Sequence, residues 1–216
     1  MSTAMPAATQ EYLQAVYTLA DEGGRVIAAR LAEFLDVTPA AVSEMVHRLE
    51  RDGLLSIDEH KTIGFSRTGS RAAASIVRRH RLAERMLVDL LGYDWWKTHE
   101  EAERIEHAMS DEMEERLTRV LGNPETCPHG NPMPGVKPRA TRTLESLRPG
   151  ESSAVVRIPD QFEHEPGFLE YLDGVGIKPQ IRVTLVSLDE RSLRIAIDGQ
   201  ERGVRRDCGH KVLVAA

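Results

Sequence analysis

Three apolar stripes at helical spacing begin the chain, and the third has clear helix boundaries. The first stripe lies within residues 11–21 and the second within 27–35. Thr38 and Pro39 are typical of a helix N-cap and first helical position, and Gly53 is typical of a helix end. Two short helices joined by a tight turn, the second of them capped, predict a helix-turn-helix.

The pattern changes to short β-type runs directly after this motif. LLSI and TIGFS flank the polar turn DEHK, which predicts the hairpin, or wing, of a winged helix. Helical periodicity resumes over 68–92 and over 98–121, with a predicted break at Ser110. Residues 122–138 hold five prolines and three glycines, so we expect a loop at a domain boundary.

Short strand-like runs separated by turns follow from Ser152 onward, interrupted by one helical piece around 165–172. Such runs predict a small β-barrel, and the fold class is therefore mainly α with a C-terminal β domain. We expect a winged helix-turn-helix DNA-binding domain at 1–72, a helical domain at 73–140, a linker at 141–150 and the barrel at 151–216.

Composition excludes several classes of protein. The 216 residues are 41% hydrophobic, enough for packed cores, and no apolar run approaches the roughly 20 residues of a membrane-spanning helix. The first residues, MSTAMPAATQEYLQ, lack the charged and apolar regions of a secretory signal. Cys127 and Cys208 are too few for a disulfide framework. We expect a soluble, cytoplasmic protein that has no membrane partner.

The net charge of −6 hides an uneven distribution. Residues 25–81 carry ten Lys and Arg against seven Asp and Glu, whereas residues 99–125 carry nine acidic residues against three Arg. The first segment suits the phosphates of a nucleic acid, and the second suits a cation. The alternative is that both segments are solvated helix faces.

The second helix of the motif would lie in the DNA major groove, with its early residues nearest the base edges. Ser43 can bond a base or a phosphate, and Glu44 can accept from a cytosine amine. Arg48 and Arg51 are predicted phosphate contacts, and their alternative is pairing with acidic residues along their own helix. The full predicted DNA-contacting set is Thr38, Ala40, Ala41, Ser43, Glu44, Arg30, Arg48, Arg51 and Lys61.

Potential metal ligands cluster on the two helices that follow the wing. Spacings of three and four residues place the donors of each helix on one face, from which they can converge on one or two cations. The donors are His80 and Glu84 on the first helix and His99, Glu103, Glu106 and His107 on the second. A solvated acidic face is the alternative. Cys127 and His129, with Pro128 between them and no paired donors nearby, predict a structural loop rather than a metal site.

Two other classes of function were weighed. Glu-x-x-Glu-His at 103–107 is one residue away from the His-x-x-Glu-His arrangement of inverted zinc proteases. A metallohydrolase built on this helix leaves the winged helix unexplained, and no cleft signature accompanies it. A winged-helix regulator that responds to an organic ligand is the remaining alternative. A non-enzymatic, metal-responsive regulator accounts for both groups of residues.

Residues 9–135 contain the segments TQEYLQAVYTL, VTPAAVSEMVHRLERDGLL, RRHRLAERMLVDLLG, HEEAERIEHAMSDEMEERL and PHGNPMPG. Together they resemble the diphtheria toxin repressor and manganese transport regulator family of metal-activated transcriptional repressors. The three-domain form of that family adds an SH3-like (FeoA-like) barrel, which agrees with the strand-rich end, although that end matches less closely. The resemblance implies a homodimer with its interface in 73–121, bound singly or as two dimers to a pseudo-palindromic operator of metal-uptake genes.

The resemblance also implies two metal sites. The family's primary site falls on Glu11, Glu103, Glu106 and His107, and its second site on His80, Glu84 and His99. A further donor is expected from the barrel near Glu163–Glu165, where His164 aligns best. Gln14 stands where the two-domain manganese regulators have a second carboxylate, so the second site should follow the three-domain pattern.

The identity of the donors points to the metal. Iron-type members usually have Met and Cys where this chain has Glu11 and Glu103, and carboxylates are hard donors that suit Mn²⁺. We therefore expect Mn²⁺ at about two sites per subunit, with Fe²⁺ as the main alternative. Zn²⁺, Co²⁺, Ni²⁺ or Cd²⁺ are expected to substitute in vitro.

Overall fold

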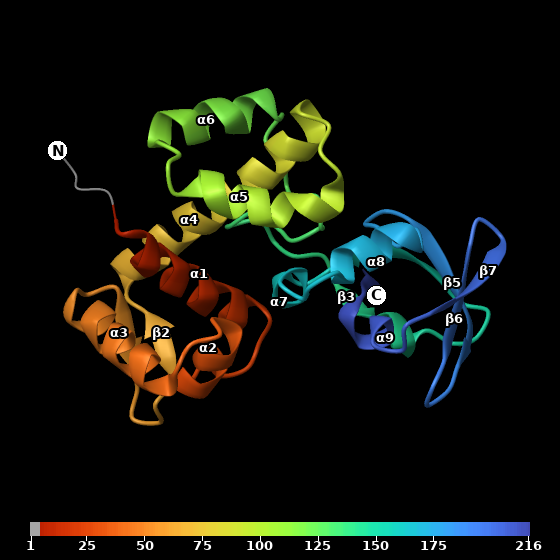
Figure 1. Ribbon diagram of the computed structural model, residues 1–216, viewed down its shortest axis with the longest axis horizontal. Helices are drawn as coiled ribbons and strands as arrows, with labels where there is room; N and C mark the ends of the chain where they lie inside the picture. The colour runs from red at the N-terminus through yellow and green to blue at the C-terminus, as the bar shows by residue number, and fades with distance from the viewer. Residues whose placement is uncertain (1–4) are drawn as a thin grey trace.

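The computed structural model describes residues 5–216 as three bodies, and the first four residues of the expected DNA-binding domain lie outside the described part (Figure 1). The N-terminal body is a winged helix-turn-helix, as predicted. Its elements are α1 (Ala7–Asp21), α2 (Ala28–Phe34), α3 (Pro39–Arg51) and the antiparallel hairpin β1 (Leu55–Ile57) with β2 (Ile63–Phe65).

Helix α3 begins and ends at the predicted residues. The Thr38 hydroxyl accepts a hydrogen bond of 3.2 Å from the Ala41 amide, and Pro39 occupies the first helical position, where its missing N–H is not needed. Gly53, with a φ of +70°, follows the helix. Leu49 on the inner face is fully buried in the N-terminal core, so the opposite face of α3 is left to solvent.

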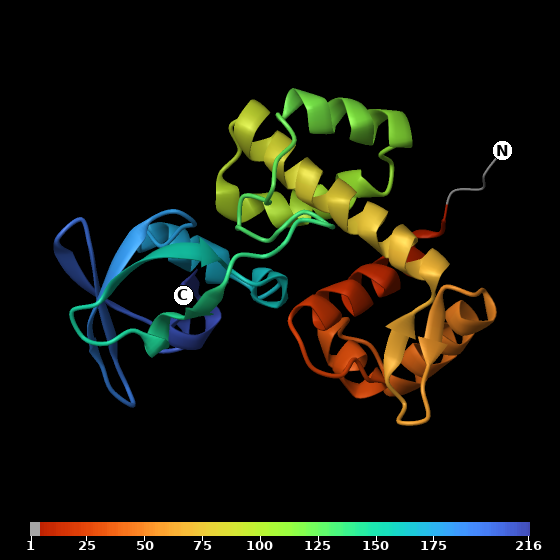
Figure 2. The ribbon, with the colours of Figure 1, turned by 180° about the vertical axis from the view of Figure 1, so that it is seen from behind.

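Helix α4 (Arg67–Arg85) runs from the wing into the second body as one continuous element (Figure 2). Ser66 caps it by accepting a 2.9 Å hydrogen bond from the Gly69 amide. Gly69 is required there because a Cβ would collide with the Leu54 carbonyl group, against which the helix start packs. The same helix therefore belongs to the DNA-binding body at one end and to the helical domain at the other.

The second body packs two shorter helices against the C-terminal half of α4. A π-helical turn (Met86–Leu90) and a 3-10 turn (Trp95–Lys97) lead to α5 (Thr98–Glu106), which is followed by α6 (Asp111–Val120). The predicted break at Ser110 is confirmed, since its hydroxyl accepts from the Met113 amide at 3.2 Å and caps α6. Within the described residues, no helix combines the length and the apolar character needed to span a bilayer.

The C-terminal body, which we continue to call the barrel, is a six-stranded antiparallel sheet in the order β3-β8-β4-β5-β6-β7. Three short helices pack with the sheet around its core. The strands are β3 (Thr141–Thr143), β4 (Ser152–Arg157), β5 (Arg182–Leu188), β6 (Leu193–Ile197), β7 (Gln200–Val204) and β8 (Leu213–Ala215). The helices are α7 (Asp160–Glu163), α8 (Phe168–Gly174) and α9 (Cys208–Lys211).

Residues 141–150, expected as a linker, are part of this sheet domain. Strand β3 pairs with β8, and Arg142 lies opposite Val214. Leu144 and Leu147, which follow the strand, are buried in the core of the sheet domain. A three-residue strand is too short to produce a readable alternation, so the sequence pattern hides it.

The barrel is joined to both other bodies at its α7 end. The Arg81 guanidinium, 1% exposed, pairs with Asp160 at 2.6 Å. Arg157 pairs with Asp21 at 3.3 Å, and the Gln161 amide donates to a carboxylate oxygen of Glu22 at 2.9 Å. These contacts hold the start of the barrel against α4 and against the end of α1.

The proline-rich segment 122–138 is buried in its middle part, residues 127–134, whereas most residues on either side of that part are exposed. Cys127, His129 and Asn131 are each no more than 1% exposed. The Asn131 side-chain amide donates to the Ile158 carbonyl oxygen at 2.7 Å, which ties the segment to the barrel. The predicted domain boundary therefore lies inside a three-way junction of α4, this segment and the barrel.

Candidate metal centre

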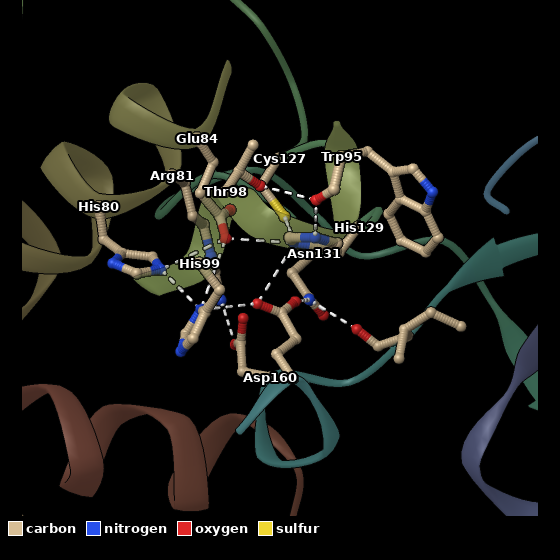
Figure 3. Close-up of polar contacts among 12 residues, drawn as sticks. His80, Arg81, Glu84, Trp95, Thr98, His99, Cys127, His129, Asn131 and Asp160 are labelled. Atoms are coloured by element: carbon tan, nitrogen blue, oxygen red, sulfur yellow. Dashed lines mark hydrogen bonds and ion pairs between the residues drawn. The ribbon is translucent and has the colours of Figure 1, made fainter. Parts of the chain in front are cut away.

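Buried ionisable side chains gather where α4, α5, the proline-rich segment and α7 meet (Figure 3). Four of them, which we call the inner group, offer ligand atoms that all lie within 4.8 Å of one another. They are His80 and Glu84 from α4, His99 from α5 and Glu163 from α7. The structure brings together the three helical residues that the resemblance assigns to the second site, and Glu163 lies within the segment Glu163–Glu165 from which a further donor is expected.

Two carboxylates and two imidazoles face one another in the inner group. A carboxylate oxygen of Glu84 lies 3.4 Å from His80 Nε2 and 3.5 Å from His99 Nδ1. A carboxylate oxygen of Glu163 lies 3.1 Å from His99 Nδ1. This mixed oxygen and nitrogen donor set is of the kind that binds Mn²⁺ or Fe²⁺.

Three carboxylate oxygens of the inner group have no hydrogen-bond partner of good geometry within residues 5–216. They are both oxygens of Glu84 and Oε2 of Glu163, on side chains that are fully buried. A buried carboxylate oxygen without a hydrogen bond carries a desolvation cost of several kcal/mol, on the order of that for other buried charges. A divalent cation held by these oxygens would remove that cost, so the residues fit the metal that such a donor set implies.

Charge pairing dominates the protonation of the inner group. Burial alone lowers the pKa of His80, but the carboxylates of Glu84 and Glu106 outweigh burial and raise that pKa to about 10. Burial acts on His99 in the same direction, but the neighbouring carboxylates of Glu103, Glu163 and Glu84 outweigh it and raise the pKa of His99 well above the usual value. Both rings are therefore imidazolium ions at neutral pH and must lose a proton to bind a metal.

A second group of donors adjoins the inner group through Glu84. His129 Nδ1 lies 3.1 Å from Glu84 and 3.3 Å from Glu163, and Cys127 Sγ lies 4.0 Å from the same nitrogen. The His129 Nε2–H donates to the Trp95 carbonyl oxygen at 2.9 Å, which leaves Nδ1 as the ligand atom when the ring is neutral.

The expectation that Cys127 and His129 have no paired donors nearby is wrong. Both side chains are buried against donors from other elements, and the trio of Glu84, Cys127 and His129 lies within 4.8 Å. The sequence signal was a Cys-x-His pair, and its partners could not be found by spacing because they come from helices far away along the chain.

An outer group lies on the solvent side of His99. It consists of His99 Nε2, Glu103 from α5 and His164, which follows α7. His164 Nδ1 is 3.2 Å from His99 Nε2, and a Glu103 oxygen is 3.5 Å from the same atom. Partial burial and the neighbouring His99 lower the pKa of His164 to about 4, so its ring is a neutral acceptor.

The four residues mapped onto a primary site are not brought together. Glu11 is exposed on α1, and His107 Nδ1 instead lies 3.2 Å from the side-chain oxygen of Gln10. Glu106 is bonded to His80 Nδ1, and Glu103 faces the outer group. Three carboxylates at one point repel one another, and in this arrangement Glu103 and Glu106 each face an imidazole instead. The primary site stays a prediction.

The predicted DNA-contacting side chains form an exposed surface over α3 and the wing. Arg48 and Arg51 make no ion pair within the described part of the chain, which argues against their pairing along the helix. Arg30 is different, because its guanidinium donates to the Arg25 carbonyl oxygen at 3.0 Å and supports the turn before α2. The remaining exposed members are Thr38, Ala40, Ala41, Ser43, Glu44 and Lys61.

A winged helix whose connecting helix carries a buried cluster of histidines and carboxylates defines a metal-dependent DNA-binding regulator. Three family models match the chain: the iron-dependent repressor N-terminal DNA-binding domain over residues 5–63, its metal-binding and dimerisation domain over 66–135, and the FeoA domain over 142–216. The chain belongs to the iron-dependent repressor family, which includes the diphtheria toxin repressor. Members of this family are metal-dependent transcriptional repressors and not enzymes.

Relatives named for iron and for manganese both match over nearly the full length. The iron-dependent repressor IdeR of Mycobacterium tuberculosis is 39% identical over 207 residues, 89% of this chain and 90% of the relative. The diphtheria toxin repressor of Corynebacterium diphtheriae is 33% identical and covers 95% and 96%. A solved manganese-dependent transcriptional repressor in complex with manganese is 34% identical, with a TM-score of 0.85 over 96% of this chain and 99% of that one.

Proposed function

We propose that this protein is a Mn²⁺-activated homodimeric repressor that binds a pseudo-palindromic operator and controls metal-uptake genes. The observation that carries the proposal is the set of buried carboxylate oxygens on Glu84 and Glu163 that lie beside histidines but accept no hydrogen bond of good geometry among residues 5–216. Hard oxygen donors favour Mn²⁺. The resemblance to a manganese-dependent repressor in complex with manganese supports the same choice.

Fe²⁺ is the second candidate activator, because of Cys127. Its sulfur belongs to the donor trio with Glu84 and His129, and sulfur favours later and softer ions than Mn²⁺. The relatives named as iron-dependent point in the same direction. Selectivity between the two ions would then depend on whether Cys127 is used as a ligand.

A dimer is supported by apolar side chains on the helical domain. Between 40% and 67% of each of Leu90, Leu91, Met113 and Val120 is exposed, on the π-helical turn, the residue after it and α6. A second copy packed there would cover these side chains and present two recognition helices to two half-sites. We propose DNA binding by 1–72, metal binding and dimerisation by 73–140, and a barrel that begins at 141.

The proposed coupling uses elements shared between the bodies. Helix α4 starts at the wing and carries His80 and Glu84, so an ion in the inner group would act on the helix that supports the DNA-binding body. At the primary site, Glu103, Glu106 and His107 would hold an ion together with Glu11 of α1. An ion there would join α1 to α5, which already meet through Gln10.

The test is operator binding at controlled free metal. A duplex selected from a random pool by the Mn²⁺-loaded full chain would be titrated after chelator treatment and after addition of Mn²⁺, Fe²⁺ or Zn²⁺ at matched free concentrations. We expect chelator to abolish operator binding and Mn²⁺ to restore it. Binding that is indifferent to chelator would contradict the proposal, and restoration by Fe²⁺ alone would select the second candidate.

A further inference from the structure

The His99 ring separates the inner group from the outer group. Its Nδ1 atom lies 3.1 Å from His80 Nε2 and 3.1 Å from a Glu163 oxygen, both buried. Its Nε2 atom lies 3.2 Å from His164 and 3.5 Å from Glu103 on the other side. One imidazole therefore offers one nitrogen to each of two groups of metal-type donors.

The outer group is reached through an acidic cavity of about 540 Å³. Six carboxylates line it, those of Glu100, Glu101, Glu103, Glu163, Glu165 and Glu170. Its single lysine, Lys97, is already paired with Asp94 at 2.8 Å. A concave surface of one sign of charge concentrates ions of the other sign, so the cavity attracts cations.

We propose that His99 Nε2, Glu103 and His164 form an outer cation site where a divalent ion binds first, before it passes to the inner group. This inference rests on the proposed metal-sensing function. An ion that arrives from solvent meets the outer group first, because the outer group is more exposed than the inner group. The side chains of Glu103 and His164 are 47% and 37% exposed, whereas those of the inner group are at most 7% exposed.

The two sites exclude each other because of the chemistry of His99. A neutral imidazole has one lone pair, so the ring ligates an inner ion through Nδ1 or an outer ion through Nε2, and not both at once. Either tautomer keeps its N–H satisfied, since Nε2–H faces Glu103 and His164 and Nδ1–H faces Glu163. An ion at the outer site is therefore in transit. Its transfer inward moves the His99 proton from Nδ1 to Nε2 and releases the proton of His80 to solvent.

A buried carboxylate oxygen gives the direction of transfer. Glu163 lines the cavity, but its Oε2 atom is buried against the imidazoles of His99 and His129 and, among the described residues, accepts no hydrogen bond of good geometry. An ion that moves inward gains this oxygen and those of Glu84, so the inner group is the more stable position. The outer site then sets the rate of loading, and the inner group sets the affinity.

Stopped-flow mixing of the chelator-treated full chain with Co²⁺ tests this order, since a paramagnetic ion in the inner group quenches the fluorescence of nearby Trp95. His164→Gln removes a ligand of the outer site only. We expect both the association and the dissociation rates of Co²⁺ to fall by about tenfold or more, with the equilibrium affinity changed less than about twofold. Glu100→Gln, which removes a cavity charge outside the outer group, is the matched control and should change the rates far less.

Three outcomes would overturn the inference. Unchanged rates in His164→Gln would show that ions bypass the outer group. A lower equilibrium affinity at unchanged association rate would make His164 a ligand of the inner ion. Equal slowing by Glu100→Gln would reduce the effect to general attraction by the acidic cavity. Failure of the proposed function would look different, because the wild-type chain would then load Co²⁺ but bind the operator equally well without metal.

Discussion

Binding of one ion to the inner group at pH 7 is expected to release about two protons. The two histidines must be neutral to bind a metal. In the metal-free protein, charge pairing with Glu84, Glu106 and Glu163 keeps His80 and His99 protonated. The measurable quantity is the number of protons released for each ion bound.

The magnitude follows from the pKa values. Two histidines with an ordinary pKa of about 6.5 are each about one-quarter protonated at pH 7 and would release about half a proton in total. With the pKa of His80 at about 10 and that of His99 well raised, both are fully protonated and two protons are released. The apparent affinity should then rise about a hundredfold from pH 7 to pH 8. Deprotonation of His80 alone costs about 4 kcal/mol at pH 7.

The number of protons released does not depend on whether the ion binds in the inner group or at the adjoining trio of Glu84, Cys127 and His129. If the ion instead takes Cys127 and His129 with Glu84, it must displace the thiol proton, whose pKa is raised to about 12 by burial and by Glu84, and one histidine proton. That again gives about two protons at pH 7. A primary-site ion would contribute protons of its own, so the experiment uses the His107→Ala variant.

The assay is calorimetric titration of Mn²⁺ at pH 7 in buffers that differ in ionisation enthalpy. The slope of apparent enthalpy against buffer enthalpy gives the proton count directly. Stability of the metal-free protein should change in the opposite direction, because the stabilisation from His80 is complete below pH 6.5 and is lost as pH rises through about 10. A release below about one proton would refute the reasoning, since the histidines would then be neutral before metal arrives.

Three further predictions concern stability and DNA binding. Asp160→Asn leaves the buried Arg81 charge unpaired and should lower the free energy of unfolding in urea by about 3–5 kcal/mol. Glu112→Gln, which removes one partner of an exposed pair, should lower it by at most about 0.5 kcal/mol, and equal losses would show that burial does not decide the cost. Burial raises the pKa of Glu22 to about 7. The free energy of unfolding should therefore fall by about 1 kcal/mol, allowing for solvent screening, as pH rises from about 4.5 to about 7. Glu22→Gln should remove this pH dependence, and a variant that keeps it would show that another group is responsible. Arg48→Ala should reduce the dependence of operator affinity on salt by about one unit of slope, and an unaltered slope would mean that Arg48 does not contact phosphate.

Local signals were sufficient for the elements that present DNA-contacting residues. The cap at Thr38, the glycine after α3 and the polar turn of the wing are read from neighbouring residues, and each lies where the sequence predicts. Strand β3 escaped prediction because its three residues acquire their partner from β8 at the far end of the chain. Short-range patterns carry no information on such a pairing.

The metal centre divides in the same way. His80, Glu84 and His99 could be predicted because helical spacing puts donors on one face. Cys127 and His129 could not, because their neighbours in space come from α4 and α7. Glu103 has the predicted helical position, yet its side chain pairs with imidazoles of the outer group, because the charges of its neighbours decide its rotamer.

The proposed function requires that metal binding and operator binding are coupled, and a thermodynamic cycle measures this coupling. The Kd of the selected operator duplex would be measured with and without saturating Mn²⁺, and the Kd of Mn²⁺ with and without saturating duplex, on the same full chain. Linkage requires the ratio of the two duplex Kd values to equal the ratio of the two Mn²⁺ Kd values. We expect each ratio to be at least about tenfold. A ratio of one in both directions would contradict the account, because the metal would then bind without acting on DNA.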